Sequence, residues 1–157
     1  MQTTYYNTPI GTVKISGSEK GVRSVTFLEK TIQPSSVIPD CLKNCVIQLN
    51  EYFTKHRTTF NLKLDLQGTE FQQKVWGELL HISYGKTKTY LEQAKALKNV
   101  KAIRAIASAN GKNPLAIIIP CHRVIGSNGS LTGYAGGIWR KKWLLEHEKA
   151  LNQQTLF

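Results

Sequence analysis

A cysteine followed at once by a histidine has the residue types that can do chemistry. Cys121 and His122 follow an apolar run, 114–120, that ends in proline, and we expect this run to be a strand that delivers the thiol to an edge. Cysteine attacks as the thiolate, so near neutral pH its pKa must fall or a base must take its proton. His122 and Arg123 supply basic neighbours. Spacing alone equally allows a buried cysteine that acts as a small apolar side chain.

A possible acid partner for the histidine comes near the C-terminus. Glu148 falls on an expected helix, 139–149, whose apolar face can pack onto the core. A carboxylate there could orient His122 and stabilise its imidazolium, as in Cys-His-acid arrangements. By itself, the same residue equally indicates a solvated helix carboxylate.

Between these residues, the segment 126–137 holds five glycines in twelve residues. This composition predicts a loop whose backbone comes close either to itself in tight turns or to a flat ligand.

The first half of the chain predicts a small sheet with one helix. Over residues 1–30, apolar and polar residues alternate between turn signals, which is typical of a small antiparallel sheet. Helical spacing of apolar residues follows over 42–53, with Asp40 as the expected N-cap. A short strand-like stretch, 62–66, ends this half.

The second half predicts mainly helices. Thr69 can cap a helix that runs to Leu80. Two shorter helical patterns, 89–97 and 100–110, are separated by two residues in a basic stretch, and such a pair resembles a helix-turn-helix. The polar tail, 152–157, is expected to fray.

The charge balance favours a polyanionic partner. Lys and Arg outnumber Asp and Glu by 21 to 10, a net charge of +11 on 157 residues. Residues 1–67 carry 8 basic against 5 acidic residues, a net +3, whereas residues 68–157 carry 13 against 5, a net +8. A generally lysine-rich proteome is the alternative. The basic stretch 86–112 nevertheless indicates a phosphate-facing surface.

The cysteine count and the hydropathy indicate in which cellular compartment the protein is expected. Cys41, Cys45 and Cys121 form an odd set, and residues 1–6 have neither the basic nor the apolar region of a signal peptide. We therefore expect free thiols and a cytoplasmic location, at the nucleoid if the cell is prokaryotic. No apolar run approaches the ~18–20 residues of a membrane span, so no membrane partner is expected.

The surroundings of Cys121 resemble those of the O6-alkylguanine-DNA alkyltransferases, the methylated-DNA–protein-cysteine methyltransferases. The sequence Pro120-Cys121-His122-Arg123-Val124 is similar to the active-site signature of this family. Residues 68–149 match the family's motifs closely and in the same order. Residues 1–67 resemble the family only in their general sequence pattern. The further matching pieces are Gly68-Thr69-Glu70-Phe71-Gln72-Gln73-Lys74-Val75-Trp76, Tyr84-Gly85 through Tyr90, the Arg104 helix, Asn113-Pro114, Gly133-Tyr134-Ala135-Gly136-Gly137 and Trp143-Leu144-Leu145-Glu146-His147-Glu148.

The resemblance implies an α/β fold in two domains. Residues 1–67 would form a ribonuclease H-like small antiparallel sheet with a helix. Residues 68–157 would form a mostly helical, winged helix-turn-helix-like domain for DNA binding and alkyl transfer. The implied function is DNA repair by direct reversal. After base flipping, the alkyl group would pass from O6-alkylguanine, and also from O4-alkylthymine, irreversibly to Cys121, once per molecule and without a cofactor.

The resemblance also implies roles for the catalytic residues. Cys121 would be the nucleophile and acceptor, and His122, paired with Glu148, would take the thiol proton through a water. Tyr90 would donate a proton toward guanine N3, and Asn113 would brace the turn before the active-site segment. Without the resemblance, Tyr90 indicates a core or helix-cap aromatic and Asn113 a plain turn former.

DNA contacts are implied for the second helix of the helix-turn-helix. Arg104 would enter the duplex where the base has left, and small neighbours would let the helix approach the minor groove with little sequence preference. The partner would be double-stranded DNA, bound by a monomer, with cooperative binding left open. The implied DNA-binding residues are Lys101, Ala102, Arg104, Ala105, Ser108 and Tyr90, and the implied pocket residues are Val124, Tyr134, Ala135 and Gly136.

One departure from the family concerns the pocket. Ala135 stands where some members have a serine that contacts O6, which puts the pocket width and the substrate range in doubt. Some relatives bind zinc, but here Cys41 and Cys45 are helically spaced without a second pair, and we expect no metal.

Two other classes of function compete with alkyl transfer. A non-catalytic helix-turn-helix regulator or damage-recognition protein would be indifferent to Cys121→Ser. A Cys-His hydrolase would turn over and would need neither the basic stretch nor Arg104. Both classes explain fewer of the residues.

Overall fold

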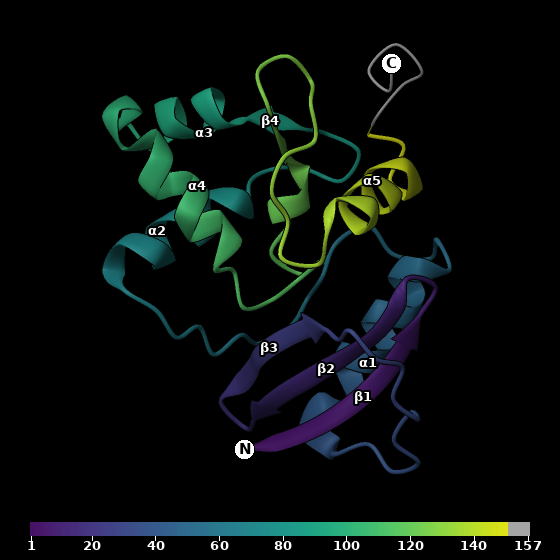
Figure 1. Cartoon of the computed structure of the whole chain (residues 1–157). Coiled ribbons are helices and arrows are strands. Elements are labelled where there is room, and N and C mark those ends of the chain that lie inside the picture. Colours follow the sequence, from purple (N-terminus) through teal and green to yellow (C-terminus); the bar gives the residue numbers. More distant parts are fainter. Residues whose placement is uncertain (151–157) are drawn as a thin grey trace. The chain divides into compact units, whose positions relative to one another are not determined.

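The computed structural model describes residues 1–150, which pack into two compact units (Figure 1). One unit holds Met1–Gln67 and Pro114–Ile118, and the other holds Gly68–Asn113 and the described residues from 119 onward. The predicted frayed tail, 152–157, lies outside the described residues.

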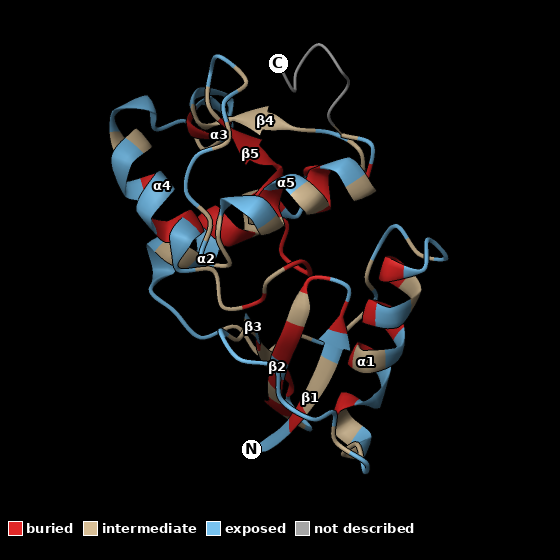
Figure 2. Ribbon diagram, turned by 45° about the vertical axis from the view of Figure 1, so that its right-hand side comes forward, coloured by how far each residue is buried: buried red, intermediate tan, exposed pale blue. Residues whose placement is uncertain are grey.

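The N-terminal unit is an antiparallel sheet with one helix, as the sequence predicts. Strands β1 (Gln2–Thr8), β2 (Gly11–Ser18) and β3 (Gly21–Phe27) pair in chain order. Helix α1 (Asp40–Phe53) packs along this sheet (Figure 2). The fully buried Ile15 of the central strand pairs with residues of both neighbouring strands, so the core of this unit lies between the sheet and α1.

One local expectation for this unit was wrong, and another was confirmed only in part. Pro39, not Asp40, is the N-cap of α1, because the fixed φ of proline ends the extended chain directly before the first helical residue. The Asp40 side chain is exposed and pairs with Lys43 at 2.8 Å. The strand-like stretch 62–66 makes a single parallel bridge, from Leu64 to Val22.

The apolar run before Cys121 is not a strand. Only Leu115 forms a bridge, to Val25, and the chain then turns, with Ile118 N donating to Ala116 O at 2.8 Å. Ile117 has a φ of 73°, which is unfavourable for a β-branched residue. Its side chain is buried, so the apolar run signals burial and not continuous strand pairing.

The C-terminal unit is mostly helical, as predicted. Thr69 caps its first helix in a capping box with Gln72, which confirms the predicted start. Two short strands pair in parallel beside the helices. The elements are α2 (Glu70–Leu79), β4 (Lys88–Thr89), α3 (Tyr90–Ala96), η1 (Val100–Ala102), α4 (Ile103–Gly111), η2 (Cys121–Arg123), β5 (Val124–Ile125) and α5 (Ile138–His147).

The predicted helix-turn-helix consists of α3 and α4. Buried Gln93 and Asn110 exchange two amide hydrogen bonds of 2.8 Å, which fix the two helices against each other. The buried Trp76 indole donates to Ala109 O at 2.9 Å and ties α4 to α2. No helix among residues 1–150 is long and apolar enough to span a membrane.

Candidate active site

Asn113 holds the turn that carries the cysteine. Its amide nitrogen donates to Ile119 O at 2.7 Å and lies 3.3 Å from Cys121 Sγ, close enough for a weak hydrogen bond to sulfur. Cys121 opens η2 directly after Pro120 and is partly exposed. One amide group therefore fixes both the backbone before the cysteine and the position of its thiol.

His122 and Glu148 form a fully buried pair. His122 Nε2 and Glu148 Oε2 are 2.8 Å apart, and neither side chain is exposed. Because an ionised carboxylate only accepts hydrogen bonds, Nε2 carries the proton and Nδ1 keeps its lone pair in the neutral ring. Nδ1 is buried and makes no hydrogen bond within residues 1–150, so it has the character of a base.

Arg123 engages the same carboxylate and not the thiol. Its Nε and Nη2 donate to the two oxygens of Glu148 at 2.8 and 3.1 Å, and its Nη1 donates to Ile82 O. This bidentate pair fixes the plane of the carboxylate that His122 also contacts. The expectation that Arg123 supplies charge to Cys121 therefore needs correction.

The electrostatics favour a neutral thiol beside a neutral base. Burial raises the pKa of Cys121, although Asn113 and Lys141 oppose this. Burial also lowers the pKa of His122, more than Glu148 raises it. Burial would raise the pKa of Glu148, but His122 and Arg123 hold it well below its usual range. The resting site thus holds a thiol, an unprotonated imidazole and a carboxylate.

A pocket of about 520 Å³ opens onto Cys121. The hydroxyl of Tyr90 donates to Thr132 O at 3.2 Å, which ties α3 to the glycine-rich loop. The hydroxyl of Tyr134 is buried and makes no hydrogen bond within the described part of the chain, and burial raises its pKa well above 10. The lining residues are Tyr90, Ala107, Asn110, Gly111, Cys121, Thr132, Gly133, Tyr134 and Ala135.

Lys141 is a residue of this site that the sequence reasoning missed. Its ammonium donates to Thr132 O at 2.7 Å, lies 5.9 Å from the Tyr90 ring centre and is buried. Burial lowers the pKa of Lys141 to about 8, against a raising effect from Cys121. Lys141 lies seven residues before Glu148, on the buried stripe of α5, so helical spacing counted back from Glu148 would have found it.

The structure brings some of the expected site residues to the pocket and leaves others apart. Tyr90, Tyr134 and Ala135 line it with Cys121, whereas Gly136 does not, and Val124 is buried in β5. Thr132 and Gly133 belong to the glycine-rich loop that the sequence expected close to itself or to a flat ligand. The sequence did not indicate the pocket residues at the end of α4, which are Ala107, Asn110 and Gly111.

Apart from the pocket residue Tyr90, the expected DNA-contacting residues lie in η1 and in the first two turns of α4. Lys101, Arg104, Ala105 and Ser108 are exposed, and Ala102 is partly exposed. Helix α4 also reaches the pocket through its later residues, so it presents both an exposed side that carries Arg104 and a pocket wall.

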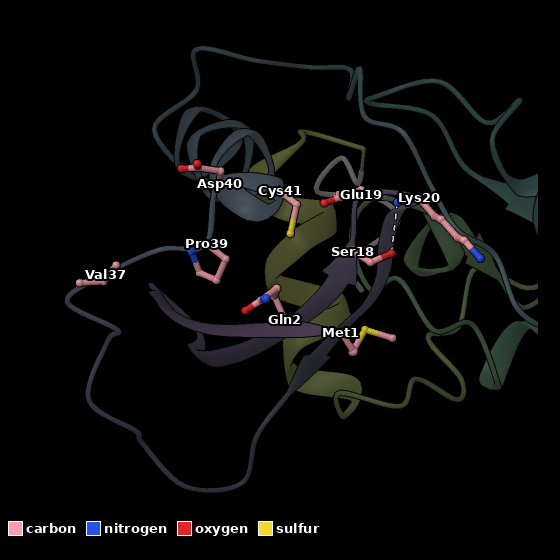
Figure 3. Close-up of a pocket in the computed structure, with 9 residues that line it drawn as sticks. All are labelled: Met1, Gln2, Ser18, Glu19, Lys20, Val37, Pro39, Asp40 and Cys41. Carbon is pink, nitrogen blue, oxygen red and sulfur yellow. Dashed lines mark hydrogen bonds between the residues drawn. The ribbon is translucent and has the colours of Figure 1, made fainter.

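A second pocket, of about 670 Å³, lies in the N-terminal unit (Figure 3). Cys41 lines it together with the oppositely charged Glu19, Lys20 and Asp40, but no predicted site residue does. Within residues 1–150, no group of three or more His, Cys, Asp or Glu could hold a metal ion. Among the predicted catalytic residues, Cys121 and Tyr90 line the Cys121 pocket, whereas His122 and Glu148 form a buried pair outside its lining.

Comparisons with known proteins find a matching family model for each half of the chain. Residues 1–66 match the family model "6-O-methylguanine DNA methyltransferase, ribonuclease-like domain", and residues 70–150 match "6-O-methylguanine DNA methyltransferase, DNA binding domain". The methylated-DNA–protein-cysteine methyltransferase of Mycobacterium tuberculosis is 47% identical over 148 residues, which cover 92% of this chain and 90% of the relative. The enzyme of the same name from Methanosarcina acetivorans is 45% identical over 148 residues, covering 91% and 95%.

Solved structures agree over the whole length. The crystal structure of Mycobacterium tuberculosis OGT in complex with DNA has a TM-score of 0.86 and 44% identity and covers 99% of this chain and 98% of that one. The crystal structure of the O6-methylguanine methyltransferase of the same organism has a TM-score of 0.83 and 46% identity, with 99% of each chain covered.

Proposed function

Because the chain belongs to the 6-O-methylguanine DNA methyltransferase family, we propose that it repairs DNA by transferring the alkyl group of O6-alkylguanine irreversibly to its own Cys121. O4-alkylthymine is proposed as a further substrate. The residue assignment rests on two observations. Cys121 lines the pocket, and the next residue, His122, forms a buried pair with Glu148. Residues 68–157 would carry both DNA binding and transfer.

The proposed transfer is a displacement at the alkyl carbon. His122 Nδ1 takes the thiol proton through a bridging water, while Glu148 holds Nε2–H and stabilises the imidazolium that forms. The sulfur attacks the alkyl carbon as the carbon–oxygen bond breaks, and a thioether forms. The electron pair of the broken bond leaves with guanine, to which Tyr90 donates a proton at N3.

The raised pKa of Cys121 fits a thiol that reacts only with the help of a base. Asn113 and Lys141 lower this pKa, and so favour the thiolate as the proton leaves. Thioether formation has no return path, so each molecule acts once and needs no cofactor.

DNA would be bound through the open side of α4. The exposed Lys101 and Arg104 offer positive charge, and the small Ala105 and Ser108 allow close approach to the minor groove. Arg104 would fill the position of the flipped base, which the pocket receives. We propose a monomer with little sequence preference in the cytoplasm.

The test is the recovery of guanine in a duplex that carries a single O6-methylguanine. Equimolar protein should convert the modified base to guanine, as read by nucleoside analysis, and Cys121→Ser should bind the duplex and convert none. Binding without conversion by the unaltered protein would contradict the proposal and make the chain a damage-recognition protein.

A further inference from the structure

We infer that Arg140, stacked on Trp139, is a positioning residue that sets the shape of the substrate pocket by holding the backbone of the glycine-rich loop. This inference rests on the proposed alkyl transfer. Arg140 does not line the pocket, so its effect must pass through the loop residues that do.

The contact between Arg140 and the loop is direct. Its Nη1 donates to Gly136 O at 2.8 Å, directly after the pocket residues Tyr134 and Ala135. Gly137 N donates to Tyr134 O at 2.9 Å and closes this part of the loop as a turn. A guanidinium on Gly136 O therefore fixes the turn that begins at Tyr134, a residue of the pocket lining.

Trp139 holds the guanidinium in place. The Arg140 charge lies 4.4 Å from the centre of the Trp139 ring, a close cation–π stack, although this ring is 57% exposed. A Cβ at Gly137 would lie 3.3 Å from Cδ1 and Nε1 of the same ring, so the indole also covers the loop backbone. Gly137 has a φ of 95°, a conformation that suits glycine.

The loop needs such ties because its glycines leave it conformationally free. Lys141 holds the other end of the pocket segment, at Thr132 O and Gly133 O. The first turn of α5 thus forms hydrogen bonds to the loop on both sides of Tyr134. Lys141 binds the loop before Tyr134, and Arg140 binds it after Tyr134.

A different role for Arg140 would be that of a simple phosphate-binding charge. Lys142 is the matched control, because it carries the same charge on the same helix, is exposed and pairs only loosely with Glu146 at 3.9 Å. Arg140→Lys keeps the charge but loses the planar fork that stacks and donates at the same time.

The experiment measures the single-turnover rate of transfer to Cys121 from two substrates, an O6-methylguanine duplex and the free nucleoside O6-methyldeoxyguanosine, which has no phosphate. Arg140→Ala should slow transfer from both by roughly tenfold, as a misplaced pocket wall would. Arg140→Lys and Trp139→Ala should lie between this variant and the unaltered protein, and Lys142→Ala should leave the nucleoside rate unchanged.

Three outcomes separate the possibilities. Slower transfer by Arg140→Ala from the duplex alone, matched by Lys142→Ala, would overturn the inference in favour of a phosphate contact. Unchanged rates with a lowered unfolding midpoint would overturn it in favour of a purely structural role. If Arg140→Ala does not fold, Arg140→Lys and Trp139→Ala carry the test. No transfer by the unaltered protein would instead refute the proposed function.

Discussion

Glu148 is the shared hydrogen-bond acceptor of His122 and Arg123 in the site. It accepts hydrogen bonds from His122 and Arg123 while fully buried. Glu148→Gln keeps the shape but leaves the Arg123 charge unpaired and places an amide donor against the donors of its partners. We expect the free energy of unfolding to fall by about 3–5 kcal/mol and the transfer rate to fall at least tenfold.

Urea denaturation and single-turnover kinetics measure these two effects. Glu146→Gln is the control, since this carboxylate is exposed and makes only a 3.9 Å pair with Lys142. Its change in unfolding free energy should stay within about 1 kcal/mol. Equal effects of the two substitutions would show that the buried network of Glu148 contributes no more to stability and transfer than an exposed carboxylate does.

The pH dependence follows from the lowered pKa of His122. Burial keeps the imidazole neutral below its ordinary pKa of 6.5, so a reaction that uses it as the base should keep a constant rate from pH 7.5 to 6.5 and slow only in more acidic solution. A thiolate formed without a base would instead give a rate that rises with pH, because the pKa of Cys121 is raised. Single-turnover rates across this range decide between them.

Stability should fall in acid for the same structural reason. In the unfolded chain His122 takes up a proton near pH 6.5 and Glu148 near pH 4.5, whereas the folded protein keeps both proton-free to lower pH. The unfolded state therefore binds more protons, and the free energy of unfolding decreases below pH 6.5 and more steeply below pH 4.5. Denaturation midpoints that stay constant between pH 7 and 4 would contradict this.

At the level of single residues, the sequence predicted those that belong to a recognisable motif. Resemblance placed Cys121, His122 and Glu148 together, and the structure joins His122 to Glu148 directly. Lys141 was missed because a lysine within a run of basic residues ordinarily indicates a solvated helix face. Its burial depends on the path of the glycine-rich loop, which sequence periodicity does not report.

At the level of elements, two capping boxes offer a matched comparison. Thr69 and Gln72 cap α2, and Thr89 and Glu92 cap α3, with hydrogen bonds of 3.0 to 3.1 Å. Each Thr→Ala change should lower the free energy of unfolding by about 1 kcal/mol. Thr89→Ala should also slow transfer, because Tyr90 at the pocket is the next residue in the chain.

Chemical denaturation checks the first expectation and single-turnover kinetics the second. Thr69→Ala should leave the transfer rate unchanged, since its helix contributes no pocket residue. If both variants slowed transfer equally, loss of stability and not misplacement of Tyr90 would be the cause.

The start of an element was predictable where a side chain determines it. The hydroxyl of Thr69 and the amide of Gln72 satisfy the first backbone groups of α2, and the sequence shows both. Asp40 misled because Pro39 precedes it and takes the cap position. The run 114–120 misled because burial of apolar residues does not by itself require a strand ladder, as the turn at Ile117 shows.

At the level of the whole molecule, the net charge of +11 predicts DNA affinity that weakens with salt. Lys101→Ala removes one exposed charge at the start of the second helix of the helix-turn-helix. We expect weaker binding of all sequences, with the slope of log affinity against log salt reduced by about 1.

The control is Lys43→Ala, an exposed lysine on α1 of the N-terminal unit. It removes the same charge from the whole molecule, so equal slopes for the two variants would show that net charge and not the α3–α4 surface governs binding. Fluorescence titrations of a labelled duplex at several salt concentrations provide both slopes.

The central claim, transfer to Cys121, is tested most directly by the mass of the intact protein after incubation with excess O6-methylguanine duplex. We predict a single gain of one methylene, about 14 Da, because the thiol itself becomes the acceptor. Peptide mapping should place it on Cys121, and Cys121→Ser should gain nothing. No gain, more than one gain per molecule, or a gain on Cys41 or Cys45 would contradict the account.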